Sequence, residues 1–230
     1  MKRTSTIHAL LVALITACAG PGYRADDYVS LRPPGLGQPE SAVHVSADVE
    51  VVWRRVIARM SESPLFITDV DRDSRLIIAD FSAPNPADYL DCGTAEGEYV
   101  QRTDTTQTEL RLAEGGRIEW GLQTRKHTGV SVETRGSLEL TASLSGGVNV
   151  HLAPTQSGTD VMVNARYLLG IAQRGARIAD GTRSELGFDE MFAFSTHGRE
   201  QYRTMSPVTS ILRCTPTGAL EHLVLDMARE

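Results

Sequence analysis

The amino terminus constrains this chain most, because it has the form of a secretion signal. Lys2 and Arg3 precede an apolar run from Ala9 to Ile15, which is the order of the charged and apolar regions in a signal peptide. A helix needs about 20 apolar residues to span a bilayer, so this run is too short to remain as an anchor. We therefore predict that residues 1–17 are removed and that the rest of the chain folds outside the cytoplasm.

The apolar run ends in Leu14-Ile15-Thr16-Ala17-Cys18. This segment resembles the bacterial lipobox, in which an aliphatic residue and two small residues precede an obligatory cysteine. The resemblance implies cleavage before Cys18, a diacylglyceryl group on its sulfur, and usually a further chain such as palmitate on the freed amine. Several acyl chains anchor a protein stably, whereas a single chain binds a membrane only marginally. We therefore expect a lipoprotein whose acylated Cys18 sits in a lipid bilayer of the bacterial envelope.

The residue after Cys18 bears on which membrane holds the anchor. An Asp at this position favours retention in the inner membrane of enterobacteria, and this chain has Ala19 instead. We therefore expect the outer membrane, with the folded part in the periplasm.

The sequence divides the mature chain into a tether and one domain. Residues 18–41 contain the lipidated cysteine and then a polar stretch rich in Pro and Gly, which is typical of a flexible tether. A coil of this length has a root-mean-square reach of roughly 25 Å. From residue 42 to 230 the chain has ordinary globular composition, since 41% of the whole sequence is hydrophobic and 23% is charged. We predict a single domain over 42–230.

The charge balance argues against nucleic acid as a partner. The formal net charge is −6, and removal of Lys2 and Arg3 makes the mature chain more acidic. Nucleic-acid binding normally needs a basic stripe that releases counterions from phosphates. Arg54, Arg55 and Arg59 lie together, but beside acidic residues, which is typical of a solvated helix face.

Two cysteines remain once Cys18 is lipidated. Cys92 and Cys214 both lie in turn-like sequence, and an even pair in an oxidising compartment favours a disulfide. The alternative is a pair of unpaired structural thiols. The histidines show no ligand spacing with one another or with the cysteines. We therefore expect no metal site and no cofactor.

Hydrophobic spacing predicts two helices and a hairpin. Apolar residues recur at intervals of three and four from Val49 to Met60 and again from Leu220 to Met227, which indicates two core-facing helices. The apolar runs Leu65–Val70 and Leu76–Phe81 have the four turn-forming residues Asp71-Arg72-Asp73-Ser74 between them, which predicts a β-hairpin beside the first helix.

The middle of the chain is expected to form a meander of antiparallel strands. The predicted strands are Thr108–Leu112, Arg117–Thr124, Val132–Leu144, Val148–Leu152, Asp160–Ile171 and the short Met191–Phe194. Spacers such as Ser145-Gly146-Gly147 have the composition of tight connections. The polar segment Gln173–Glu190 is interpreted as a long loop or a hairpin extension. The expected fold class is α+β, with the antiparallel meander packed on an N-terminal and a C-terminal helix in a helix-grip-like arrangement.

A family resemblance accompanies this reading. Its residues are Val52, Trp53, Val56, Ile57 and Met60 of the first helix, the hairpin Phe66-Ile67-Thr68-Asp69 with Ser74-Arg75-Leu76-Ile77, and Leu220, Glu221 and Leu223 of the last helix. Together with the tethered amino terminus, these look like the BamC-type lipoproteins of the outer-membrane protein assembly machinery. The similarity covers about residues 45–82 and the final helix. It implies a helix-grip fold and a protein partner in the envelope.

No catalytic motif stands out in the sequence. Ser195 and His197 are close along the chain but lack the Gly-x-Ser-x-Gly elbow of a nucleophile. Asp69, Asp71 and Asp73 alternate as in a calcium loop, but the Gly and Glu of such a loop are missing. We therefore expect no catalytic residues and no enzyme.

Two function classes remain. The first is a non-catalytic interaction or assembly module at the outer membrane, docking on an envelope protein. The second is a carrier that holds a lipid or another amphiphile in a cavity between the sheet and the C-terminal helix. A contiguous apolar void would favour the carrier, and a filled core would favour the docking module.

Overall fold

A computed structural model describes residues 29–35, 37–101, 104–125, 131–179, 181–198, 200–203 and 211–229. Its two helices are α1 (Val49–Ser61) and α2 (Ala219–Arg229). The Asp48 side chain caps α1 by accepting a hydrogen bond from the Glu50 amide at 2.8 Å. Both helices lie within one or two residues of the bounds that their apolar spacing predicts.

Strands make up most of the rest of the described chain. They are β1 (Val29–Arg32), β2 (Ala42–Val45), β3 (Phe66–Asp71), β4 (Leu76–Ala83), β5 (Leu90–Asp91), β6 (Thr94–Gln101), β7 (Asp104–Arg111), β8 (Gly116–Arg125), β9 (Ser131–Pro154), β10 (Thr159–Ala179), β11 (Thr182–Ser195), β12 (Glu200–Arg203) and β13 (Ile211–Pro216). A short 3₁₀ turn, Pro86–Asp88, precedes β5.

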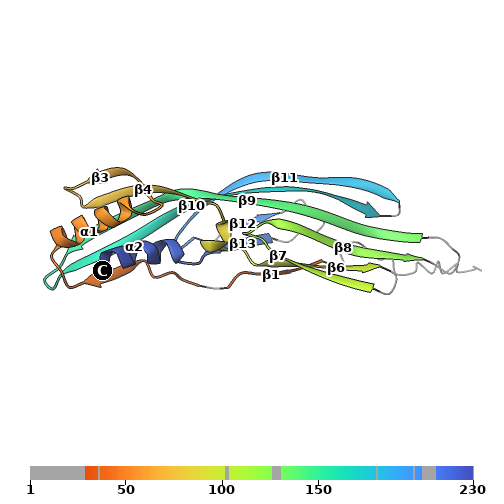
Figure 1. The fold of residues 1–230 in the computed structure, drawn as a ribbon, viewed down its shortest axis with the longest axis horizontal. Helices are drawn as coiled ribbons and strands as arrows, with labels where there is room; N and C mark the ends of the chain where they lie inside the picture. The colour runs from red at the N-terminus through yellow and green to blue at the C-terminus, as the bar shows by residue number, and fades with distance from the viewer. Residues whose placement is uncertain are drawn as a thin grey trace, which may run out of the picture.

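The molecule is elongated, and β9 and β10 run along almost its whole length (Figure 1). They pair antiparallel throughout, from Thr159 against Pro154 to Ala179 against Thr134. The 24 residues of β9 correspond to about 80 Å of strand. These two strands therefore act as a common spine that carries different partners at its two ends.

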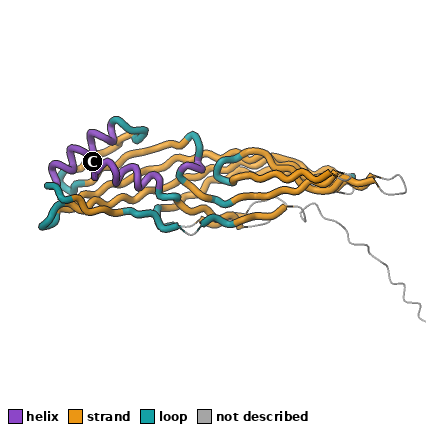
Figure 2. The backbone as a smooth tube through the Cα atoms, turned by 60° about the horizontal axis from the view of Figure 1, so that its bottom comes forward, coloured by secondary structure: helices purple, strands orange, loops and turns teal. Residues whose placement is uncertain are grey.

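We call the two ends the helix half and the strand half. The helix half contains α1, α2, β2, β3 and β4 together with β9 from Leu144 onward and β10 up to Leu169. The strand half contains β1, β6, β7, β8 and β11 with the rest of the spine. A small sheet of β12, β13 and β5 lies at the junction, which we call the waist (Figure 1). Figure 2 shows both helices gathered at one end of the molecule, with strands alone at the other.

In the helix half, one face of the sheet packs on the helices and forms the main core. Val148, Val150 and Leu152 of β9 and Val161 and Val163 of β10 alternate with exposed or half-buried residues. They join one contiguous apolar cluster with the helix residues Val52, Val56, Met60, Val224 and Leu225, each of which is fully buried. This face is the inner face, and the opposite one is the outer face.

The apolar cluster continues into the strand half, where the sheet curls. Trp120 of β8 is fully buried and lies directly opposite Gly136 of β9. Thr108 of β7 donates a hydrogen bond of 3.2 Å to the Glu119 carbonyl of β8. This cross-connection holds β6 and β7 against β8 and helps to exclude water from the inner face of this half.

The expected α+β, helix-grip-like class is wrong. The part of the chain that the structure describes is mostly β-sheet, with 63% strand and 16% helix, and its sheet is large, curled and mixed; β6 and β8 are parallel. One reason is that Gly146 and Gly147 form no turn but lie inside β9. A Cβ on Gly146 would lie 2.0 Å from the Arg166 carbonyl oxygen and 2.8 Å from the Phe81 ring, so this glycine permits close packing within the sheet.

A second difference concerns the segment 173–190. It is the outer part of the β10–β11 hairpin, paired from Ala179–Thr182 to Arg166–Ser195. Of the two interpretations of this segment, the hairpin extension agrees with the structure and the long loop does not. Residues 29–32, which the sequence pattern assigns to the tether, form β1 against β6.

Candidate functional site

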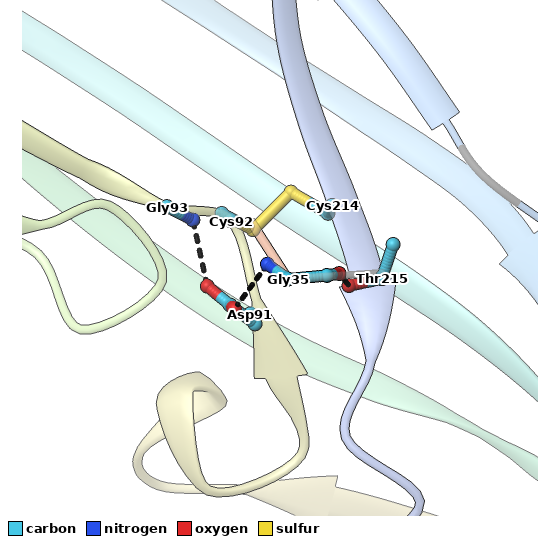
Figure 3. The surroundings of a disulfide bond; sticks show 6 residues. All are labelled: Gly35, Asp91, Cys92, Gly93, Cys214 and Thr215. Atoms are coloured by element: carbon cyan, nitrogen blue, oxygen red, sulfur yellow. Dashed lines mark hydrogen bonds between the residues drawn. A yellow bond between two sulfur atoms is a disulfide. The ribbon is translucent and has the colours of Figure 1, made fainter. Parts of the chain in front are cut away.

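The predicted lipidation site, Cys18, lies outside the described residues. The other two cysteines meet at the waist, where the Cys92 and Cys214 sulfur atoms are 2.07 Å apart in a disulfide bond (Figure 3). Cys92 follows β5 and Cys214 lies in β13, and both side chains are buried. The bond thus ties the chain shortly before α2 to the beginning of the strand half.

The segment that leads from the amino terminus is also fixed at the waist. Asp91 accepts hydrogen bonds from the Gly93 amide at 2.8 Å and from the Gly35 amide at 3.0 Å, and Thr215 donates to the Gly35 carbonyl at 3.2 Å (Figure 3). Gly35 is thereby held between β5 and β13.

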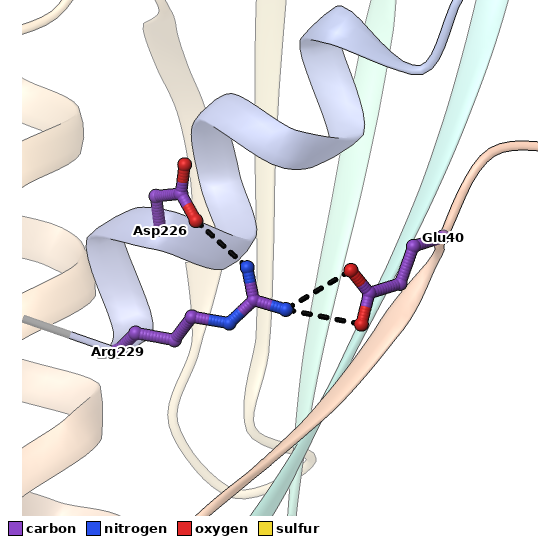
Figure 4. Close-up of polar contacts among 3 residues, drawn as sticks. All are labelled: Glu40, Asp226 and Arg229. Carbon is purple, nitrogen blue, oxygen red and sulfur yellow. Dashed lines mark hydrogen bonds and ion pairs between the residues drawn. The ribbon is translucent and has the colours of Figure 1, made fainter.

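The same segment is fixed again beside α2. Arg229 donates to both carboxylate oxygens of Glu40 at 3.0 Å and to Asp226 at 2.8 Å (Figure 4). These hydrogen bonds, first to Asp226 and then to Glu40, raise the pKa of the guanidinium. The chain therefore runs from β1 in the strand half, past the waist, to the helix half.

A buried carboxylate lies between α2 and the spine. Glu221 and Tyr167 are 0% and 1% exposed, and the phenol donates to both Glu221 oxygens, at 2.9 and 3.0 Å. The Tyr167 ring stacks on Phe194 at 5.5 Å and meets the edge of Phe81 at 5.8 Å. Glu221 is also in the first turn of α2, where the helix dipole favours a negative charge. The pair fixes α2 on the sheet.

The substitution Tyr167→Phe should lower the free energy of unfolding by about 2 kcal/mol, because Glu221 then loses its phenol donor. Burial, followed by the Glu221 charge, raises the pKa of Tyr167, whereas in the unfolded chain it is about 10. Below that pH the phenol is protonated in both the folded and the unfolded chain, so its full contribution to the free energy of unfolding is present. At higher pH the unfolded chain loses its proton first, so stability falls by up to about 1.4 kcal/mol per pH unit.

Urea unfolding of the wild type and of Tyr167→Phe between pH 8 and pH 11 measures this effect. The variant should show a shallower decline above pH 10. Tyr99→Phe, whose phenol donates to Gln123 at the sheet surface at 3.1 Å, is the control and should keep the wild-type slope. Equal slopes for wild type and Tyr167→Phe would contradict the proposed linkage.

Three side chains in the helix half have the order of a hydrolytic triad. Ser157 Oγ lies 3.2 Å from His44 Nε2, and His44 Nδ1 lies 2.7 Å from Asp160 Oδ1. Catalysis would also need donors for an oxyanion and a cleft that excludes water. The His44 and Asp160 side chains are 41% and 51% exposed, and the hollows described below are lined by other residues. We interpret the contacts among these three side chains as structural, because they hold β2 against the β9–β10 turn.

The residues that the sequence analysis weighed as a catalytic pair or a calcium loop either do not contact one another or stabilise a local turn. The His197 ring is exposed, 3.5 Å from the Ser41 hydroxyl, and no described hydrogen bond joins it to Ser195. Asp71 caps the β3–β4 turn by accepting from the Asp73 and Ser74 amides at 2.9 and 3.2 Å. Hydrogen bonds from Ser74 lower the pKa of Asp71. Within the described ranges no group of His, Cys, Asp and Glu is placed to hold a metal ion.

The outer face carries exposed apolar side chains that sequence reasoning missed. Phe66 is 72% exposed and Met191 59%. Strand pairing places Phe66, Asp80, Gly147 and Arg166 in one row across the sheet. All four residues therefore lie on the outer face. The exposed Met162 and Leu168 alternate with the buried residues of β10 on this same face. The alternation of apolar residues on both sides of β10 was a signal that could have found them.

Two hollows lie on the outer face of the strand half. One, of about 490 Å³, lies beside Met191 and is floored by small residues such as Ser143 and Gly170. The other, of about 240 Å³, is lined by Arg117, Arg135 and Arg183. Each of these arginines also bonds a glutamate two residues away on its own strand, at 2.6 to 2.7 Å. The hollow is therefore polar and lies close to the end of the strand half.

Comparison with known protein families, with characterised proteins and with solved structures finds no match to this chain. The helices in the described part of the chain are too short or too polar to cross a bilayer.

Proposed function

We propose that the protein is a membrane-anchored envelope lipoprotein that acts as a non-catalytic interaction or assembly module at the outer membrane. The lipobox at Cys18 supports the anchor. The observation that carries the interaction role is the outer face, where Phe66, Met162, Leu168 and Met191 project apolar side chains into solvent. Exposed apolar surface bordered by polar residues is typical of protein interaction sites.

The packing of the helix half supports this role over the alternative, a carrier of a lipid or other amphiphile. A carrier needs an apolar cavity of a few hundred Å³ between sheet and helix. In this layer Val56, Met60, Leu152 and Val224 are each 0% exposed and belong to one contiguous cluster. The space in which a ligand would lie is occupied by side chains.

Site-specific photo-crosslinking in native membranes tests the interaction role. A photoreactive phenylalanine analogue replaces Leu168 on the outer face or, as the control, the exposed Ala58 on α1. We expect a protein crosslink of one defined mass from position 168 and none from position 58. Crosslinks to lipid alone, with a stoichiometric lipid in the purified protein, would favour the carrier instead. Intact-mass analysis of the same material tests the diacylglyceryl group on Cys18.

A further inference from the structure

The path of the chain sets limits on how an anchor at Cys18 can orient the molecule. β1 pairs antiparallel with β6, with Val29 opposite Gly97 and Arg32 opposite Thr94. β6 starts beside the waist and runs outward through the strand half to Gln101 (Figure 1). The described chain therefore begins well inside the strand half and runs from there toward the helix half.

The strand registers show which residue of β9 lies level with Val29 along the length of the molecule. Tyr99 lies level with Gly121, so Gly97 lies level with Glu119, and a Cβ on Gly97 would be 2.5 Å from the Glu119 carbonyl oxygen. Glu119 in turn pairs with Ser137. Val29 is therefore level with Ser137 of β9.

The reach of the amino-terminal segment can be compared with the two ends of the molecule. From Cys18 to Val29 are 11 residues, which span at most about 40 Å. From Ser137 to the end of β9 at Pro154 are 17 residues, or about 56 Å, and from Ser137 to Ser131 at the other end are six, or about 20 Å. If the molecule stood upright with its helix half on the membrane, the segment from Cys18 to Val29 would be too short to reach the bilayer. If the strand half faced the membrane, the same segment would be long enough.

Exposed guanidinium groups gather on the outer face near the end of the strand half. The turns at the far end of the helix half carry Asp48, Asp69, Asp71, Asp73 and Asp160 beside Arg72 and Arg75. Near the end of the strand half, Arg117, Arg135 and Arg183 line the 240 Å³ hollow. Each bonds a glutamate on its own strand, and the arginine side chains are still 65%, 48% and 64% exposed. Guanidinium groups bind phosphate in fork geometry, and anionic headgroups attract basic residues that lie near the membrane surface.

We propose that the strand half is the membrane-proximal half and that its end docks on anionic lipid headgroups through Arg135 and Arg183, holding the helix half away from the bilayer. This inference rests on the proposed function, because it needs the lipid on Cys18. It adds the surface that faces the membrane and leaves the helix half to face a partner in the periplasm.

Energy transfer from the protein to labelled lipids tests the orientation. The mature lipidated protein is reconstituted into vesicles of phosphatidylethanolamine and phosphatidylglycerol with an acceptor dye on the headgroups. A donor dye is attached at Thr182→Cys, at the end of the strand half, or at Gln156→Cys, in the β9–β10 turn of the helix half. The native cysteines are acylated or paired, so each variant offers one thiol. We expect severalfold higher transfer from position 182.

Charge variants test the docking contact in the same assay. The double substitution Arg135→Ala with Arg183→Ala should lower transfer from position 182 severalfold, and 1 M salt should do the same by screening. Arg54→Ala with Arg72→Ala removes the same charge from the helix half and should leave transfer unchanged. Transfer from position 156 equal to or above that from 182, or no effect of the Arg135 and Arg183 variant, would overturn the proposal. Intact-mass analysis distinguishes failure of the proposed function from failure of the proposed orientation. A mass that shows no acyl group on Cys18 would contradict the proposed function. Acylated protein that shows higher transfer from position 156 than from position 182 would contradict only the orientation.

Discussion

Loss of the disulfide between Cys92 and Cys214 is expected to lower the free energy of unfolding by about 4 kcal/mol. The bond closes a loop with a sequence separation of 122 residues, so in the chain-entropy model it removes much of the freedom of the unfolded chain. It also holds β13 against β5 just ahead of α2, which has only 11 residues. A helix of that length is marginal without tertiary packing, so α2 should loosen first.

Denaturant unfolding and amide hydrogen exchange measure this effect. The double variant Cys92→Ala with Cys214→Ala should show a lower unfolding midpoint and faster exchange in α2 than in α1. Reduction of the wild-type protein is the matched control, because it breaks the bond without changing packing at either position. A thiol titration that finds both cysteines free in oxidised protein, together with an unchanged midpoint after reduction, would contradict the cross-link.

The two helices and the first hairpin could be predicted from the sequence because their signals are local. In α1 the apolar stripe through Val52, Val56 and Met60 is also the face that the structure buries. The turn between β3 and β4 follows from Asp71, whose side chain accepts hydrogen bonds from the Asp73 and Ser74 amides within the turn. Residues close in sequence decide these elements, so their periodicity is sufficient evidence.

The length of the spine could not be predicted, because glycines that normally mark turns serve here in packing. A Cβ on Gly175 would lie 2.1 Å from the Ser137 carbonyl oxygen, so this glycine lets β10 lie close to β9. The adjacent Arg174 is exposed on the outer face of the strand half. The true turn is at Gly181, with a φ of +76°, and the preceding Asp180 makes an Asp-Gly pair that is typical of a two-residue hairpin turn.

The candidate site was predictable only in part. The even number of cysteines left beside Cys18, together with the predicted oxidising compartment, was enough to suggest that Cys92 and Cys214 pair. The outer face and the arginine-lined hollow depend on strand register over long separations, such as Arg135 beside Ile178 and Ile178 beside Arg183. Register depends on the whole sheet, and a shift of one residue would move each side chain to the opposite face. The path of β1 likewise depends on its pairing with a strand far along the chain.

Gly136→Ala is expected to lower the free energy of unfolding by about 3 kcal/mol, the upper part of the range for overpacking a core. A Cβ at this position would lie 2.4 Å from Cζ2 and 2.6 Å from Cε2 of the Trp120 indole. Trp120 is 0% exposed, so its ring has no solvent to move into. The loss of packing should therefore be concentrated around β8 and β9, where the clash lies.

A second substitution should relieve this clash. Trp120→Phe shortens the ring and removes the indole N–H, which has no hydrogen-bond partner among the described residues. In urea unfolding the double variant should be more stable than the sum of the two single losses predicts, which gives a favourable coupling energy. Ser137→Ala, next along β9 but on the outer face, is the control and should change stability little. Additive effects, or a loss in Gly136→Ala no larger than in Ser137→Ala, would show that the indole does not pack on Gly136 as described.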